Sequence, residues 1–435
     1  MLNISKKTLQ GIAAAVGGIL VHLTLGNVYS FGNIMTYGVS YMHLRVNNDV
    51  TVSNFVWVNS FTLAAQGLFM VLGGLLEKRV GPRLTCLMGC SIFSGGIMLT
   101  FFTINYSLAT VYLTYGLMAG LGTAIAYASP LACGMRWFPE HKGLINGLIV
   151  GGFGLGALLS TTIQTYFLNP DNVSPDSDGY FKDDDLLDKV PNVFFLLGGV
   201  FILMEYVGCI LISTPTRNIV GDRRSLVPVE DDQNPTNTTA FCVKDLSPKE
   251  VLRTKLFYIL WFIYMFNGVA VSYISAMYKT FGQTFIKDDH FLAMVGSLAA
   301  LFNASGRILW GRIMDKTSFK TSLRILSTLF SILLCTLPTT KHMGKPGYAV
   351  WIWCIYLTFS GTFAVMPTAT EKAFGSKNYA ANYGLVFTCQ AISSPLMAVL
   401  NQLMLDAIGF TGCLLTMGAV VLLSVGMSFF LPKGL

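Results

Sequence analysis

The sequence predicts an all-α membrane protein with twelve transmembrane helices in two pseudo-symmetric six-helix bundles. The first reason is composition: of 435 residues, 53% are hydrophobic and only 12% are charged, which ordinary soluble domains do not show. The second is that apolar runs of about 20 residues, the length a helix needs to cross the hydrocarbon core, recur along the whole chain. The third is an internal repeat that relates the two halves.

Six apolar runs follow one another in the first half, and six more follow a polar stretch. The first run lacks the short apolar core and the small-residue cleavage site of a secretory signal, so we expect a retained helix. Residues 214–253 are polar, with prolines and mixed charges, and predict a linker. We therefore expect bundles at 1–213 and 254–435, with spans at 9–40, 52–76, 84–104, 107–134, 143–168 and 192–213, and then at 254–280, 291–314, 321–339, 348–370, 380–405 and 408–431.

The repeat is visible at one constant offset of 237 residues. At this offset Gly74 pairs with Gly311 and Pro130 pairs with Pro367, at equivalent places in the two hydropathy patterns. Parallel repeats of this kind occur in transporters whose halves rock against each other around a substrate site near the membrane midplane.

The charges indicate topology and exclude several classes of function. Most Lys and Arg residues lie in loops on one side if both termini are cytosolic, as the positive-inside rule requires. The net charge of +7 therefore reflects topology and contact with anionic lipid headgroups, not nucleic-acid binding. Eight of the nine cysteines lie within spans, and no HExxH or paired-cysteine motif is present. We therefore expect no metal site, no cofactor and no enzyme activity, and a monomer.

Two related loops carry charges that a gate between the halves would use. The second, GRIMDK, contains Gly311, Asp315 and Lys316, and resembles the loop signature of the major facilitator superfamily. The first, GGLLEKRVGPR, departs from it, because Lys78 stands where that family has Asp, with Glu77 before it and Arg79 after it. An acid there can latch onto a neighbouring helix N-terminus. The alternative is that these charges only set topology.

Further motifs narrow the resemblance to the oxalate:formate antiporter-like and monocarboxylate porter-like branch. These are LTLGNVYSFG in the first span, GLIVGGFGLGALL in the fifth, NASGR in the eighth and FGSKNYAANYGLVFT at the eleventh. The resemblance implies a secondary active transporter of small organic anions that works by alternating access, embedded in membrane lipid and coupled to protons or to a counter-anion.

Arg307 lies inside the eighth span, where an arginine costs about 2.5–3.5 kcal/mol to insert unless it meets water or a partner. Its side chain can snorkel to the headgroups, whereas the resemblance implies that it binds a substrate carboxylate. Oxalate-transporting relatives carry a second cation on the eleventh span, where this chain has Gln390. One guanidinium and a neutral amide suit a monocarboxylate better than oxalate.

Other residues of the spans are weaker candidates. Tyr29, Trp57 and Tyr127 lie where members of that branch line the cavity with aromatic rings, although each can instead pack between helices or lie in an interfacial aromatic belt. His22 and Glu205 are candidates for proton coupling, or for ordinary hydrogen bonds between helices. Two other functions remain open: a carrier of a neutral or zwitterionic solute with a structural Arg307, and a receptor of the same fold that does not transport.

Overall fold

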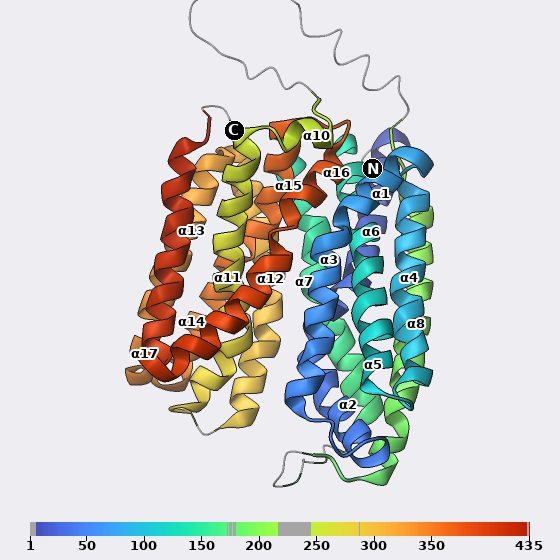
Figure 1. The fold of residues 1–435 in the computed structure, drawn as a ribbon. Coiled ribbons are helices and arrows are strands. Elements are labelled where there is room, and N and C mark those ends of the chain that lie inside the picture. The colour runs from blue at the N-terminus through green and yellow to red at the C-terminus, as the bar shows by residue number, and fades with distance from the viewer. Residues whose placement is uncertain are drawn as a thin grey trace, which may run out of the picture.

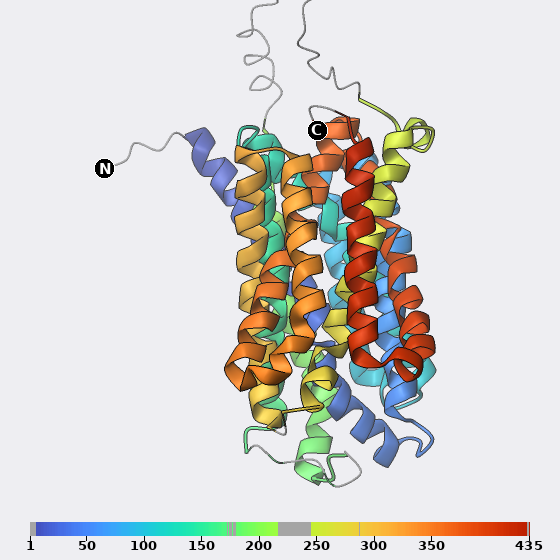
Figure 2. The ribbon, with the colours of Figure 1, turned by 90° about the vertical axis from the view of Figure 1, so that its left-hand side faces the viewer.

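The computed structural model describes residues 6–171, 173, 176, 180–215, 245–286, 288–432 and 435. Every regular element within these ranges is helical, as predicted. Figure 1 shows the helices as two groups side by side, the first half in blue to green and the second in yellow to red. The start of the first helix, the C-terminal residue and the short helix α10 (Pro248–Val251) lie at the same end of the molecule, which we call the linker end (Figures 1 and 2).

The first half contains the six predicted spans, two of which are broken by a change of helix type. The sixth begins earlier than the predicted residue 192, because the Asp183 side chain accepts a hydrogen bond from the Leu186 N–H and caps the helix. The elements are α1 (Lys6–Leu25), the 3₁₀ turn η1 (Gly26–Ser30), α2 (Phe31–Arg45), α3 (Val52–Val80), α4 (Pro82–Thr103), α5 (Leu108–Val111), the π-helix η2 (Tyr112–Met118), α6 (Ala119–Trp137), α7 (Lys142–Leu168) and α8 (Asp184–Leu211).

The second half begins after the short linker helix α10, and its last two spans run on into each other. Gly409 has a φ of 63° and separates them within α17. The elements are α10 (Pro248–Val251), α11 (Lys255–Gln283), α12 (Asp289–Lys316), α13 (Phe319–Thr336), the 3₁₀ turn η3 (Leu337–His342), α14 (Gly344–Phe359), α15 (Gly361–Phe374), α16 (Tyr379–Phe387), α17 (Gln390–Met427) and the 3₁₀ turn η4 (Ser428–Phe430).

Within the described residues, ten helices are long and apolar enough to cross a membrane. The two predicted spans outside that set are α12 and the stretch from α16 into α17. α12 is long enough, but it carries Asn303 and Arg307 in its interior. Polar residues at the centre of a spanning helix are functional candidates.

The halves touch most closely through two pairs of helices. A Cβ atom on Gly147 of α7 would lie 2.4 Å from the carbonyl oxygen of Arg307 on α12. A Cβ on Gly74 of α3 would lie 2.0 Å from the backbone nitrogen of Ala381 on α16. Both positions therefore require glycine, because the two backbones are in direct contact there.

The described hydrogen bonds between the halves come from one stretch of α7, residues 142–150, which runs from the linker end toward the middle of the molecule. Beyond it, Tyr29 of η1 lies within reach of Arg307 in the other half and is still 47% exposed. The described polar contacts between the halves therefore run from the linker end to the middle of the molecule, and Tyr29 lies beyond them.

Candidate substrate site and gate

Arg307 is completely buried at the interface between the halves. One terminal nitrogen, Nη1, donates to the carbonyl oxygen of Val150 on α7 at 2.9 Å. The other terminal nitrogen, Nη2, and Nε have no hydrogen-bond partner. Leaving donors of a buried charge unpaired is costly, so this guanidinium has the free fork that an anion would satisfy.

Aromatic rings from both halves surround the Arg307 guanidinium. Its Cζ atom lies 5.1 Å from the ring centre of Phe363, 5.8 Å from that of Phe153 and 6.0 Å from that of Tyr29. Rings at this range attract a cation and exclude water without neutralising its charge. Of these three rings, Tyr29 is the one that is largely exposed.

Tyr127 of α6 extends this aromatic wall across the interface. Its ring centre is 4.8 Å from that of His22, 6.0 Å from Phe387 and 6.4 Å from Tyr383. The hydroxyl groups of Tyr383 and Tyr264 lie 3.4 Å apart. We call Arg307 and the rings of Tyr29, Tyr127, Phe153, Tyr264, Phe363, Tyr383 and Phe387 the central cluster.

Gln390 begins α17, at the break that follows α16. Its Oε1 accepts a hydrogen bond from the Ser393 hydroxyl at 3.0 Å, which orients the amide. Its Nε2 is buried and has no partner. The structure describes no direct contact between Gln390 and Arg307.

Trp57 lies apart from the central cluster. Its side chain is 60% exposed, and the ring contact described for it is with Phe61. Leu68 and Leu75 follow it by 11 and 18 residues, close to whole numbers of helical turns, and they are 60% and 44% exposed. An apolar face of a spanning helix that is exposed in this way faces lipid. The structure therefore places Trp57 away from the central cluster, which differs from the expectation from the sequence.

The two titratable candidates have different surroundings. His22 is fully buried against Tyr127, its Nδ1 is 3.0 Å from the Gly18 carbonyl oxygen, and its Nε2 has no partner. Glu205 is buried inside the first half, where it accepts hydrogen bonds from the hydroxyls of Thr24, at 2.8 Å, and Ser94. His22 therefore adjoins the central cluster, whereas Glu205 ties α8 to α1 and α4.

At the linker end, Asp315 of α12 joins the two halves. Its carboxylate accepts hydrogen bonds from the backbone N–H groups of Gly143, at 2.8 Å, and Leu144, at 2.7 Å, in the first turn of α7. A carboxylate at a helix N-terminus is favoured by the helix dipole as well as by these bonds. The Lys142 ammonium adds an ion pair to Glu371 of α15 at 2.7 Å.

The corresponding charges of the first half do not cross the interface. Glu77 accepts hydrogen bonds from Arg136, at 3.1 Å, and Ser129, at 3.3 Å, both in its own half. Lys78, Arg79 and Lys316 are exposed. The described polar contacts between the halves at the linker end are thus asymmetric and centred on α7.

The amino-acid sequence of this chain is similar to those of known membrane transporters. The major facilitator superfamily model matches residues 23–398 and 260–434. The chain is 30% identical to "Apicoplast pyruvate carrier 1" of Toxoplasma gondii, over 97% of this chain and 88% of the relative. It is 26% identical to "Oxalate:formate antiporter" of Oxalobacter formigenes, over 74% and 69%.

The chain belongs to the major facilitator superfamily. Its fold agrees, since the proton:xylose symporter XylE superposes with a TM-score of 0.71 at 11% identity, covering 98% of this chain and 96% of that one. As a member of the superfamily, the chain is a secondary transporter and not an enzyme, and the predicted resemblance to its oxalate:formate and monocarboxylate branch is confirmed.

Several residues of the central cluster were not predicted as site residues from the sequence. Phe363 and Tyr264 are ordinary aromatic residues of apolar spans, and only packing brings them to the cluster. Phe153 and Tyr383 lie inside the quoted motifs GLIVGGFGLGALL and FGSKNYAANYGLVFT, which are usable signals.

A group of three thiols was also not expected. The sulfur atoms of Cys86, Cys90 and Cys209 lie within 4.8 Å of one another, all buried. The spacing of four residues between Cys86 and Cys90, whose sulfurs are 3.9 Å apart, places both on one helix face. The sequence could not show that Cys209 of α8 packs against them.

Proposed function

We propose that this transporter carries small monocarboxylates, such as pyruvate and acids of similar size, through a site in the central cluster. The observation that carries the proposal is the buried Arg307 guanidinium with two unpartnered nitrogens between the halves. A carboxylate offers two oxygens in the geometry of that fork. The names of the relatives, two apicoplast pyruvate carriers and an oxalate:formate antiporter, support the same class of substrate.

The polarity of the site favours one carboxylate over two. Arg307 supplies a single full charge, and the free Nε2 of Gln390 supplies a neutral donor. That donor suits a keto or hydroxyl oxygen beside the carboxylate, whereas a second desolvated carboxylate would have no charge partner. A neutral or zwitterionic solute is less suitable, because a neutral one would leave the guanidinium without a counter-charge.

We infer that the linker end faces the cytosol, with both termini, because the basic loops gather there. The structure then represents the outward-facing state of an alternating-access cycle. Release to the cytosol would require the contacts of Asp315 and Lys142 to break. Tyr29 would lie on the path by which the substrate reaches Arg307.

His22 is the better placed of the two candidates for coupling to protons. It adjoins Tyr127 and has a free ring nitrogen, whereas Glu205 is held by two hydroxyls away from the interface. Proton-driven uptake should then depend on His22, and His22→Gln should lower it while sparing exchange of one anion for another. Equal uptake in the wild type with and without a pH gradient would favour a counter-anion instead.

The test is uptake of labelled pyruvate, lactate, formate and oxalate into vesicles that contain the purified protein. Arg307→Gln removes two charge-assisted hydrogen bonds, each of about 1.5–3 kcal/mol, so the half-saturating pyruvate concentration should rise by at least about 100-fold. Arg307→Lys should fall between, because it keeps the charge and loses the fork.

Trp57→Ala is the matched control, since it removes a large side chain outside the cluster and should leave uptake near the wild-type rate. Unaltered pyruvate uptake by Arg307→Gln would exclude the proposed anion site. Uptake of none of the four acids would favour the neutral solute or a receptor.

A further inference from the structure

The first half lacks the helix cap that Asp315 supplies in the second. At the repeat offset, Lys78 occupies the position of Asp315, and Ala380 and Ala381 occupy those of Gly143 and Leu144. The first turn of α16 accordingly has no side-chain cap. The close contact of Gly74 with Ala381 shows that α3 and α16 nevertheless meet there.

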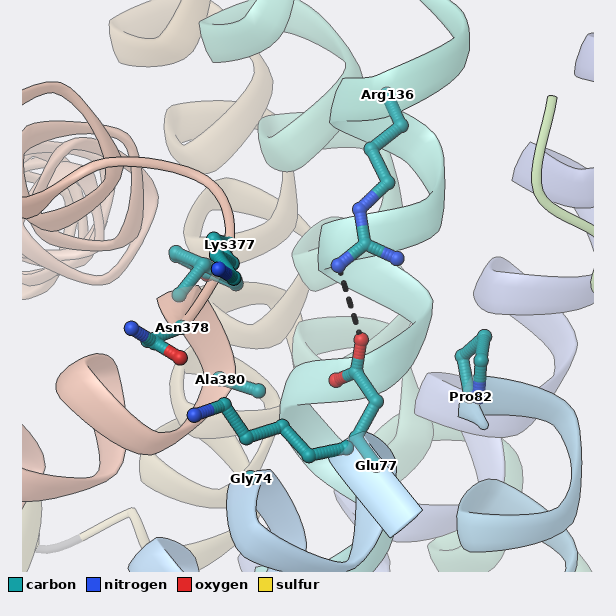
Figure 3. Close-up of a pocket in the computed structure, with 9 residues that line it drawn as sticks. Gly74, Glu77, Pro82, Arg136, Lys377, Asn378 and Ala380 are labelled. Carbon is teal, nitrogen blue, oxygen red and sulfur yellow. Dashed lines mark hydrogen bonds and ion pairs between the residues drawn. The ribbon is translucent and has the colours of Figure 1, made fainter. Parts of the chain in front are cut away.

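A pocket lies at this uncapped position, with a volume of about 120 Å³, well above the roughly 10–15 Å³ that one water molecule needs. Three of its side chains are cationic. The single carboxylate, Glu77, already pairs with Arg136 (Figure 3) and also accepts a hydrogen bond from Ser129. The pocket therefore has an excess of positive charge. It is lined by Gly74, Glu77, Lys78, Pro82, Arg136, Lys377, Asn378, Tyr379 and Ala380.

A buried acceptor in the wall specifies the ligand further. The Asn378 side chain is 6% exposed, and its Nδ2 donates to the Leu246 carbonyl oxygen at 2.7 Å, which sets the orientation of the amide. Its Oδ1 has no partner and is turned toward the pocket (Figure 3). A buried acceptor needs a donor. The backbone N–H of Lys377 is not available to bind a ligand, because it already donates to the Asp245 side chain at 3.1 Å.

We propose that this pocket binds a phosphate monoester or inorganic phosphate. Its anionic oxygens face Lys78, Lys377 and the uncapped N–H of Ala380 in the first turn of α16, as anions do at helix N-termini. Its protonated oxygen donates to Asn378 Oδ1, which neither a carboxylate nor sulfate can do at neutral pH. The bound group joins α3 to α16 as Asp315 joins α12 to α7, and so favours closure of the linker end. This role is independent of the transported substrate.

Thermal unfolding of the full-length protein tests the site, in phosphatidylcholine nanodiscs at constant ionic strength. Inorganic phosphate should raise the Tm in a saturable way, and sulfate at the same concentration should raise it less. Lys78→Asp supplies the missing carboxylate, so its Tm should be higher than that of the wild type without phosphate and should not respond to phosphate. Arg79→Asp makes the same charge change outside the pocket lining and should keep the phosphate response.

A second variant covers the case in which Lys78→Asp does not fold. Lys377→Gln removes one exposed cation of the lining and should raise the half-saturating phosphate concentration about two- to fivefold. Equal responses to phosphate and sulfate, or the same phosphate response in Lys78→Asp as in Arg79→Asp, would overturn the proposal.

Nanodiscs with phosphatidic acid, a monoester headgroup, distinguish a lipid from free phosphate. If the lipid is the ligand, phosphatidic acid should raise the Tm and abolish the response to added phosphate, while phosphatidylglycerol, a diester without the proton, should do neither. If free phosphate is the ligand, its response should persist in both lipids. No Lys78-dependent response to either source would refute the site.

Discussion

Asp315→Asn should loosen the gate at the linker end. The wild-type carboxylate accepts one N–H on each oxygen, at 2.8 and 2.7 Å. Asparagine has one acceptor oxygen, and its NH₂ group would face the second backbone N–H, donor against donor. The substitution therefore exchanges two charge-assisted hydrogen bonds for one neutral bond.

The size of the effect follows from these bonds. Charge-assisted hydrogen bonds contribute about 1.5–3 kcal/mol each and neutral ones about 0.5–1.5 kcal/mol. The lower ends of these ranges give a loss of about 2.5 kcal/mol, and solvent screening reduces it further, because Asp315 and the first turn of α7 are only part-buried. The closed state should lose about 2 kcal/mol, which is roughly a 30-fold increase in the opening equilibrium.

Hydrogen–deuterium exchange of the peptide covering residues 142–150 measures this opening directly, because both N–H groups belong to it. Exchange at the first turn of α7 should be about 30-fold faster in Asp315→Asn. Lys316→Gln changes one charge at the neighbouring exposed residue and should exchange like the wild type. If the two variants exchange equally, the Asp315 contacts do not hold the gate and the reasoning is refuted.

Three other substitutions test separate parts of the structure. Gln390→Lys adds a second cation to the site and should increase oxalate uptake relative to pyruvate; an unchanged ratio would show that this residue does not select substrate charge. Gly147→Val places a Cβ 2.4 Å from the carbonyl oxygen of Arg307 on α12 and should abolish uptake, because the two halves can no longer close. A Cβ at Gly95 meets no atom within 4 Å, so Gly95→Val should transport normally. Glu205→Leu leaves the buried Ser94 hydroxyl without its described acceptor, while the Thr24 hydroxyl keeps the Val21 carbonyl oxygen at 2.8 Å, and should cost about 1–3 kcal/mol of stability, measured by thermal unfolding; Glu205→Gln should cost less, and equal losses would mean that the hydroxyl contacts contribute little.

Much of this protein follows from the sequence because it depends on local properties of the chain. Apolar runs of sufficient length must form helices in a membrane, so the spans could be placed without a structure. The repeat offset identified Lys78 as the counterpart of Asp315, and the cost of a charge in a spanning helix singled out Arg307. The acid at residue 315 was likewise expected to meet a helix N-terminus.

The tertiary structure decided which faces of the helices meet. Rotation of a helix about its axis changes no local property, yet it turns Trp57 away from the central cluster and brings Tyr383 into it. The same packing joins Cys209 to two cysteines of α4 and leaves an uncapped pocket beside Lys78. Whether Arg307 reached the headgroups or a buried interface also depended on the neighbouring helix, because only the position of α7 determines which of its nitrogens remain unpaired.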